Sequence, residues 1–255
     1  PDDFPEIEIN EELNPLKINS SILKRVLTKT SFSMASQDVR YYLNGMLLEV
    51  QGSKINGVAT DGHRLACIKS DLPAGAEDIP SIIIPRKTVG EVRKLIEDSS
   101  GTLEIKVSDT KIQFNFNDIQ LTSKLIDGTF PDYERVIPKN NNEILDINRT
   151  NLLSAVDRVS TIVNEKSPVI KFKLIKDLVN LSTFNNDNSS ATEDIKAKYH
   201  GKEIEIGFNA KYIMDILDNL DGNEIQISFH DNSSPIIANE KSNPDLIYVL
   251  MPMRV

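Results

Sequence analysis

The stretch TDGHRLA, residues Thr60–Ala66, joins two short apolar segments and includes the end of the first and the start of the second. These segments are Val58–Thr60 and Leu65–Ile68. An Asp-Gly pair between two such segments is typical of a tight β-hairpin turn. We therefore predict a hairpin whose tip exposes a carboxylate, an imidazole and a guanidinium together.

Asp61 and His63, within this hairpin, suggest the acid/base pair of a small hydrolase. Such an enzyme needs a serine, a cysteine or a metal ion within hydrogen-bond reach of the base. Cys67 lies on the predicted hairpin strand with no motif around it, and the chain has no HExxH motif, Walker loop or nucleophile elbow. The hydrolase stays an alternative, and we predict no catalytic residue, no metal and no cofactor.

Outside the hairpin, the sequence repeats one strand–helix–strand pattern at an offset of about 121 residues. The first copy has an apolar strand at 82–84 and a helical stretch at 86–98. The second has a strand at 204–206 and a helical stretch at 209–219. A glycine and alternating strands follow in both copies, as expected of half-buried antiparallel sheet.

Each copy also opens with an amphipathic helix, predicted at 19–30 and at 149–163. Polar residues near their starts are the candidate N-caps: Ser20 or Ser21 in the first helix, and Asn148 or Asn151 in the second. The sequence therefore predicts an α+β protein of two repeated domains, 17–138 and 139–255. Antiparallel sheets lie outside in each, with the helices on one face.

The composition is that of a globular protein that can bury a sizeable core, with 39% hydrophobic and 26% charged residues among 255. No apolar run approaches the roughly 20 residues that span a bilayer, and no signal-peptide pattern is present. A single cysteine excludes an internal disulfide framework and fits a reducing compartment. We expect a cytoplasmic protein that does not enter a membrane.

Residues 1–16 are acidic and punctuated by proline, without an apolar period. The chain also begins with Pro1 rather than methionine. We interpret this segment as a linker from a missing N-terminal domain, and the chain as a fragment of a longer protein.

The net charge of −9 argues against binding of nucleic acid, but the distribution of the charges along the chain favours it. The four predicted helices carry ten basic and six acidic residues, so they hold +4 and the rest of the chain holds −13. One explanation is an ordinary solvated helix face. The other is a surface that faces a phosphate backbone without reading its sequence. Tyr41 and Tyr42, expected in a strand, could stack on bases or serve as packing.

Four motifs in order carry a resemblance to a known family: RYYLNGM (Arg40–Met46), TDGHRLA (Thr60–Ala66), FPDY (Phe130–Tyr133) and MPMR (Met251–Arg254). With this order and spacing the chain resembles the bacterial sliding clamp, the beta subunit of DNA polymerase III. That family has three repeated domains, and this chain resembles the second and third.

The resemblance implies a processivity factor rather than an enzyme: a homodimeric ring that encircles duplex DNA, with basic helices lining the hole. Partners, namely the replicative polymerase, the clamp loader and repair proteins, would dock short linear motifs in a pocket between the second and third domains. A peptide-binding scaffold without DNA is a further alternative. The implied pocket residues are Arg40, Thr60, Gly62, His63, Arg64, Leu65, Pro131, Val136, Tyr212, Val249, Met251, Pro252 and Met253, with Arg40 and Arg64 as donors at the rim.

The resemblance also implies DNA-facing and ring-closing residues. The DNA-facing positions are Lys24, Arg25, Gln37, Tyr41, Tyr42, Arg86 and Lys87, followed by Arg93, Lys94, Arg149 and Lys211. The ring interface would use Thr161, Ile162, Asp187 and Glu193. Ser189 and Ser190 stand where the family commonly has carboxylates, which would weaken this interface. Without the first domain, we expect the fragment to be a monomer.

Overall fold

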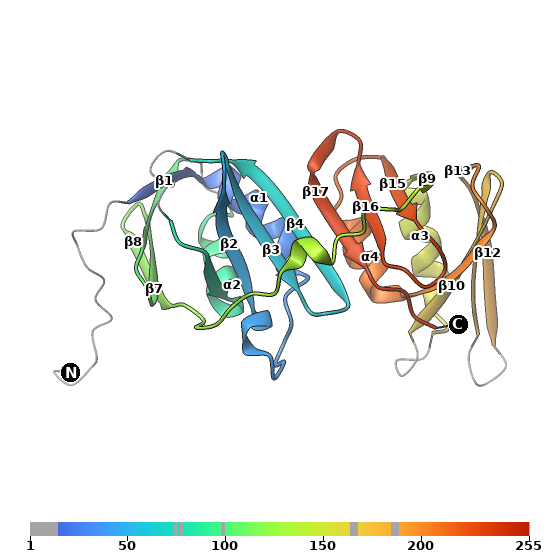
Figure 1. The fold of residues 1–255 in the computed structure, drawn as a ribbon, viewed down its shortest axis with the longest axis horizontal. Coiled ribbons are helices and arrows are strands. Elements are labelled where there is room, and N and C mark those ends of the chain that lie inside the picture. Colours follow the sequence, from blue (N-terminus) through green and yellow to red (C-terminus); the bar gives the residue numbers. More distant parts are fainter. Residues whose placement is uncertain are drawn as a thin grey trace. The chain divides into compact units, whose positions relative to one another are not determined.

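A computed structural model describes residues 15–73, 76, 79–97, 100–163, 168–184 and 189–254 (Figure 1). The chain forms two compact units. The first unit is drawn from Pro1–Gly62 and Ala66–Pro131, and the second from His63–Leu65 and Asp132–Val255.

The described residues of the first unit form two α-helices, one 3-10 helix and strands of two antiparallel sheets. Its elements in chain order are β1 (Leu16–Asn19), α1 (Ser20–Ser31), η1 (Tyr41–Asn44), β2 (Gly45–Gln51), β3 (Lys54–Thr60), β4 (Arg64–Asp71), β5 (Ile82–Pro85), α2 (Arg86–Leu95), β6 (Thr102–Val107), β7 (Lys111–Phe116) and β8 (Ile119–Lys124). One sheet has the order β1-β6-β7-β8, and the other has the neighbours β4-β3-β2-β5. The predicted hairpin is therefore present as the adjacent strands β3 and β4.

The second unit repeats this composition. Its elements are η2 (Tyr133–Arg135), β9 (Glu143–Asn148), α3 (Arg149–Ser160), β10 (Val169–Ile175), β11 (Leu178–Phe184), β12 (Ser190–Lys196), β13 (Lys198–Tyr199), β14 (Ile204–Asn209), α4 (Ala210–Asp218), β15 (Glu224–Phe229), β16 (Ile236–Glu240) and β17 (Asn243–Leu250). One sheet has the order β12-β11-β10-β14, and the other has the order β13-β9-β15-β16-β17. This architecture confirms the predicted α+β class.

The repeat found in the sequence is also a repeat of structure. In each unit a strand runs directly into the first helix, β1 into α1 and β9 into α3. Later in each unit a strand, a helix and a further strand follow one another, as β5-α2-β6 and as β14-α4-β15. The two helices of each unit pack against each other and against strands of that unit.

Three of the four helices are capped by an asparagine that is also the last residue of the preceding strand. Asn19, Asn148 and Asn209 keep extended backbone, and the side-chain oxygen of each accepts a hydrogen bond from a backbone N–H of the first helical turn. The prediction of a Ser20 or Ser21 cap was wrong by one residue. Ser20 is buried inside the first turn, and the hydrogen bond goes from the Ser21 amide to Asn19, at 2.9 Å.

The core of each unit lies between its sheets and its helices. In the second unit, strands β10 and β11 alternate along their length between buried residues and half-buried or exposed ones. Their buried residues face α3, which packs against both strands. This alternation is the period of two that the sequence showed, because successive side chains in a strand point to opposite faces.

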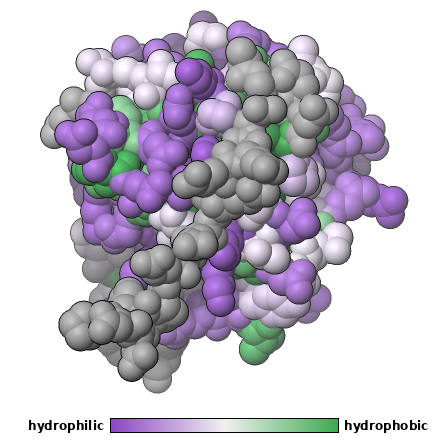
Figure 2. All heavy atoms as spheres, turned by 90° about the vertical axis from the view of Figure 1, so that its left-hand side faces the viewer, coloured by the Kyte–Doolittle hydropathy of each residue, from purple (hydrophilic) through white to green (hydrophobic). Residues whose placement is uncertain are grey.

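Hydrophilic residues predominate among the coloured residues on the face that Figure 2 shows. Figure 2 shows one face of the molecule, where the hydrophobic residues appear as small separate areas among hydrophilic ones. No helix among the described residues is long and apolar enough to cross a membrane.

Candidate functional site

Three side chains of the second unit lie around Arg64, the first residue of β4 (Arg64–Asp71). We call this group the Arg64 cluster: His63 and Arg64 from the hairpin, and Tyr212 and Asp215 from α4. Residues His63–Leu65, and with them the start of β4, belong to the second unit, and the rest of β4 belongs to the first. Asn209 begins α4 by accepting hydrogen bonds from the amides of Lys211 and Tyr212. Tyr212 and Asp215 are three residues apart in this helix and therefore lie on the same face.

Within the cluster, Arg64 is held on two sides. Its Nη1 donates a hydrogen bond of 2.5 Å to Oδ2 of Asp215, and its Cζ lies 4.3 Å from the centroid of the Tyr212 ring. The Arg64 side chain is only 8% exposed, and that of Asp215 is 30% exposed. A charge-assisted hydrogen bond and a cation–π contact in such a sheltered place are stronger than the same contacts in water.

The structure therefore corrects one prediction about the hairpin. Arg64 was expected to be exposed with Asp61 and His63, and to act as a donor at a rim. It is buried, because the tertiary fold brings α4 and its Asp215 carboxylate against the start of β4. His63 remains exposed, and its ring lies 6.3 Å from the Tyr212 ring at an interplanar angle of 27°.

The chain end reaches this cluster through backbone hydrogen bonds. The amide of Met251 donates to the carbonyl of His63 at 2.9 Å, and the amide of Met253 donates to the carbonyl of Gly207 at 2.8 Å. Pro252, between them, has no N–H that would need a partner. The Met251 side chain is 40% exposed, although large apolar side chains are usually buried. A methionine side chain is flexible and polarisable, so Met251 offers an apolar contact that adapts to ligands of different shapes.

The other predicted pocket residues of the second unit differ in exposure. Leu65 and Val249 are almost fully buried and belong to the core. Val136, at the end of η2, is exposed, while Pro252 and Met253 are half-buried. Leu65 and Val249 can therefore contribute only as core residues beneath the surface. Met251 and Val136 present apolar atoms to solvent.

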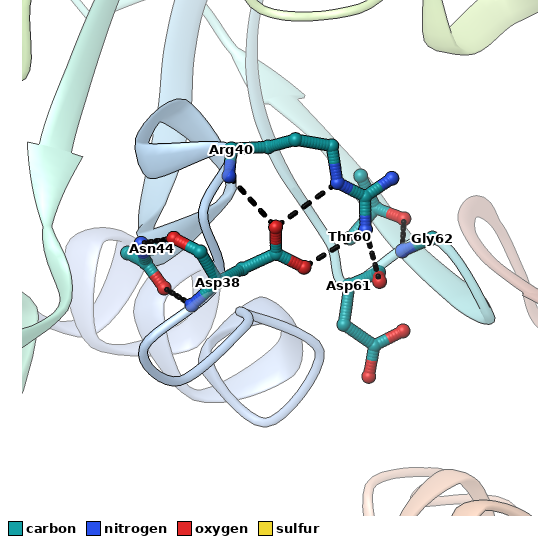
Figure 3. A network of polar contacts seen from close by, with 6 residues as sticks. All are labelled: Asp38, Arg40, Asn44, Thr60, Asp61 and Gly62. Carbon is teal, nitrogen blue, oxygen red and sulfur yellow. Dashed lines mark hydrogen bonds and ion pairs between the residues drawn. The ribbon is translucent and has the colours of Figure 1, made fainter.

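Arg40, Thr60 and Gly62 belong to the first unit and meet in a separate polar network (Figure 3). We call it the Arg40 network. Nε and Nη2 of Arg40 donate to the two carboxylate oxygens of Asp38 at 3.0 and 2.8 Å, and Nη2 also reaches the carbonyl of Asp61 at 3.4 Å. The hydrogen bonds that Arg40 donates to the Asp38 carboxylate raise the pKa of Arg40 above its ordinary value. Pro131, the remaining predicted pocket residue of the first unit, is exposed.

Gly62 gives the turn of the hairpin its shape. Its φ is +88°, a region that L side chains rarely adopt, and its amide donates to Oγ1 of Thr60 at 3.1 Å. A Cβ at this position would lie 3.2 Å from both terminal nitrogens of Arg40. The glycine therefore permits both the turn and the close approach of the Arg40 guanidinium.

No observation favours the hydrolase. Cys67, which stood nearest to the proposed Asp61 and His63 pair, is 1% exposed and so out of reach of a substrate. Among the described residues, no group of three or more His, Cys, Asp and Glu side chains is arranged to hold a metal ion.

The four helices are more basic than predicted. They hold ten basic and four acidic residues, a net +6, because α2 ends at Leu95 and leaves the acidic residues that follow outside the helix. Lys24, Arg25, Lys87, Lys94 and Lys211 are exposed. Lys24 donates to the carbonyl of Glu97, and Lys94 pairs with Glu91.

Three of the predicted DNA-facing arginines also bond to oxygens of their own unit. Arg86 donates to the carbonyls of Met34 and Ala35, and Arg93 donates to the hydroxyl of Ser31. In the second unit, Arg149 donates to the carbonyls of Gly222 and Leu217. Such bonds hold each guanidinium in place, so these residues also have a structural role.

Gln37, Tyr41 and Tyr42 lie in and after the loop that follows α1. Gln37 is exposed and has a positive φ of 60°. Tyr41 is 58% exposed, and its ring meets that of Tyr42 edge to face with centroids 6.0 Å apart. The expectation that both tyrosines lie in a strand was wrong, since they begin the 3-10 helix η1.

The predicted ring-interface residues lie at the end of α3 and on β12. Thr161 follows the last residue of α3 and is exposed, and Ile162 is half-buried. Glu193 forms a two-point ion pair with Arg158, at 2.5 and 3.0 Å, and this hydrogen bonding lowers the pKa of Glu193. Asp187 lies outside the described residues.

Sequence reasoning missed the two carboxylates that organise these sites. Asp215 appeared only as one acidic residue of a helix, although its position three residues after Tyr212 was a usable signal. Asp38, two residues before Arg40, was not considered at all. Both act through an arginine that had been identified from the motifs.

Comparison with known proteins agrees with this architecture. The family model described as DNA polymerase III beta subunit, central domain, matches residues 17–132, and the model for its C-terminal domain matches residues 134–254. The beta sliding clamp of Caulobacter vibrioides is 39% identical over 257 residues, which cover 99% of this chain and 69% of the relative. The beta sliding clamp of Escherichia coli K12 is 35% identical over 255 residues, with the same coverage.

Solved structures of such clamps share the fold. A DnaN sliding clamp from Bartonella birtlesii superposes with a TM-score of 0.95 at 40% identity, covering 99% of this chain and 70% of that one. A clamp from Caulobacter crescentus gives a TM-score of 0.96 at 39% identity, covering 100% of this chain and 69% of that one. The chain therefore belongs to the family of the DNA polymerase III beta subunit, the bacterial beta sliding clamps, which are processivity factors of DNA polymerases.

Proposed function

We propose that the Arg64 cluster, together with Met251, is the place where this clamp binds a short extended segment of its partner proteins. The observation that carries the proposal is the exposed Met251, whose backbone amide donates to the carbonyl of His63. The ring of His63 in turn stacks with that of Tyr212. An apolar side chain of a partner could pack on this surface, and a few such anchor residues usually carry most of the binding energy of an interface.

The relatives support a ligand site in this family. Clamps from Bartonella birtlesii and from Pseudomonas aeruginosa were each solved bound to griselimycin. For this chain we propose as partners the replicative polymerase, the clamp loader and repair proteins, each contributing a linear motif. The full set of pocket residues expected from the resemblance stays a prediction, including those of the Arg40 network.

The proposal extends to the parent protein. We infer two repeated domains, 17–138 and 139–255, preceded by a connection to a further domain, in a homodimeric ring around duplex DNA in the cytoplasm. Thr161, Ile162, Asp187 and Glu193 would contribute to ring closure. In this role the protein has no catalytic activity of its own, because it holds the polymerase on the template.

The test of the peptide site is a titration of the fluorescent peptide Gln-Ala-Ser-Leu-Phe into the chain. We expect saturable binding on the micromolar scale, about 8 kcal/mol, and at least tenfold weaker binding after Met251→Ala. Ile119→Ala, which removes an exposed apolar side chain of the first unit, is the matched control and should bind like the unaltered chain. A folded chain that does not bind the peptide would refute the site.

For DNA, we propose that the exposed cations of the helices make weak contacts with phosphates. Binding of a linear duplex should fall in the non-specific range, about 10⁻⁴–10⁻⁶ M at physiological salt. Arg25→Ala and Lys87→Ala should each lower the salt dependence by about one phosphate contact, since both side chains are exposed. Lys139→Ala, an exposed lysine outside the helices, is the control, and an equal effect of this change would argue against a helix-specific surface.

A further inference from the structure

Arg64 is a cation at the base of the proposed peptide site, yet the fold supplies it with an anion. Its Nη1 bonds to Asp215 at 2.5 Å, and the guanidinium is 4.3 Å from the centroid of the Tyr212 ring. Tyr212 and Asp215 come from one face of α4, so the same helix provides both the ring and the carboxylate.

We propose that Asp215 determines the ligand preference of the Arg64 cluster. By compensating the charge of Arg64, it makes the site favour an uncharged apolar side chain over a carboxylate. Asp215 is thus a specificity-determining residue that acts through Arg64. The inference rests on the peptide site proposed above and adds to it the reason for its selectivity.

The argument follows from charge and exposure. Without Asp215, the largely buried guanidinium beside Tyr212 would lack an anion and would attract a ligand carboxylate, because Arg matches carboxylates with two parallel N–H donors. With Asp215 in place, an incoming carboxylate must compete for the guanidinium and lies near a second negative charge. Repulsion of the wrong ligand is a common source of specificity.

The position of Asp215 also fits this role. Its side chain is 30% exposed, while that of Arg64 is 8% exposed, so the negative member of the pair lies nearer to solvent. A ligand approaching the cluster would therefore meet the field of the carboxylate before that of the guanidinium. The exposed His63 imidazole lies beside Tyr212 in the same cluster.

The test uses three fluorescent peptides that differ only at the anchor: Gln-Ala-Ser-Leu-Phe, Gln-Ala-Ser-Gln-Phe and Gln-Ala-Ser-Glu-Phe. All titrations are made at one pH and one ionic strength, so that only the anchor side chain differs between them. With the unaltered chain we expect the Leu peptide to bind best and the Glu peptide to bind at least threefold more weakly than its neutral Gln isostere. Better binding of Glu than of Gln would overturn the proposal without any mutation.

The variant Asp215→Asn should reverse the order of the Glu and Gln peptides, shifting their affinity ratio at least tenfold. Asp218→Asn removes the same charge from an exposed position of α4 and should leave the ratio within twofold of the unaltered chain. An unchanged ratio in a folded Asp215→Asn chain would refute the inference. If that variant does not fold, the Gln and Glu peptides on the unaltered chain still decide.

The double variant Arg64→Gln/Asp215→Asn identifies the group through which Asp215 acts. The improved binding of the Glu peptide relative to the Gln peptide, expected for Asp215→Asn, should disappear in this double variant because the guanidinium is absent. If the improvement remained, the proposal would be contradicted. Failure of the Leu peptide to bind the folded, unaltered chain is a different result. It would refute the peptide site itself and the inference with it.

Discussion

Two arginine–carboxylate pairs of this clamp have similar chemistry and different surroundings. Arg40 in the first unit bonds to Asp38 at 2.8 Å, with side chains 47% and 22% exposed. Arg64 in the second unit bonds to Asp215 at 2.5 Å, with side chains 8% and 30% exposed. The Arg40 partners are two residues apart in the chain, and the Arg64 partners are 151 residues apart.

The comparison shows that the burial of an ion pair, and not only its N–O distance, decides how much it contributes to stability. Water screens the exposed Arg40 pair, so it orders a loop more than it stabilises the fold. The sheltered Arg64 pair is different, since removal of one partner leaves a charge without compensation. The predictions below test this contrast, beginning with the largest effect.

Asp215→Ala should destabilise the protein by about 3–5 kcal/mol, because Arg64 would stay buried without its anion. Urea unfolding measured by circular dichroism is the test, with Asp218→Ala on the same helix as control. The control should change stability by no more than about 0.5 kcal/mol, since Asp218 is exposed. Equal unfolding midpoints for the two variants would contradict a structural role for the Arg64 pair.

Replacing both partners should cost much less than replacing one. In Arg64→Met/Asp215→Leu no charge is left buried, and apolar replacements of buried ion pairs are often neutral or stabilising. We expect the double variant to recover most of the stability lost in Asp215→Ala. A complete cycle with both single variants measures the coupling, and simple additivity would show that the two side chains do not interact.

Gly62→Ala should destabilise the first unit by about 1–2 kcal/mol, because its φ of +88° is unfavourable for alanine. The new methyl group would also displace the Arg40 guanidinium, 3.2 Å away. Gly90→Ala is the matched control, since that helical glycine has open space around it. The control should stabilise by about 0.5–1 kcal/mol, so opposite signs are expected for one chemical change.

Asp38→Ala should change the unfolding midpoint only slightly, and only at low salt. The pair is exposed, and salt at about 1 M reduces the screening length to roughly 3 Å. The measurement compares urea midpoints of Asp38→Ala and the unaltered chain in 10 mM and 1 M NaCl. A large loss that persists at 1 M would mean that this pair behaves like the buried one.

The smallest effect concerns a third pair, Arg158 with Glu193, which joins α3 to β12 across 35 residues. Arg158 lowers the pKa of Glu193, so the pair stabilises the fold above the unfolded pKa and loses this contribution as the pH falls through the folded one. A carboxyl-carbon NMR titration should place the Glu193 midpoint below that of an ordinary glutamate. Arg158→Gln should move the midpoint upward, and an unchanged midpoint would exclude Arg158 as the cause.

Much of the fold could be predicted because it depends on local patterns. The hairpin, the two opening helices and the repeated strand–helix–strand units all appear where alternation and helical spacing placed them. Helix ends were less certain, because an asparagine at a strand end and a serine after it are both plausible caps. The extended backbone of Asn19 decided between them, and this conformation follows from its pairing with β6.

The site was predicted only in part, for a physical reason. Arg64 and Met251 were identified from short motifs, but their exposure depends on elements far away in the chain. α4 covers Arg64, and backbone hydrogen bonds to His63 and Gly207 hold the chain end. No local pattern encodes those contacts.

By itself, the sequence determined the α+β class, the internal repeat, the family and the concentration of positive charge on the helices. Each of these depends on the spacing or composition of residues along the chain, and can therefore be seen without knowing which distant residues meet in space. Tertiary structure decided which charges are compensated: it buried Arg64 against Asp215, left Arg40 in solvent with Asp38, and engaged Arg86, Arg93 and Arg149 with protein oxygens. Burial and electrostatic pairing depend on distances in space, and these exist only once the chain has folded.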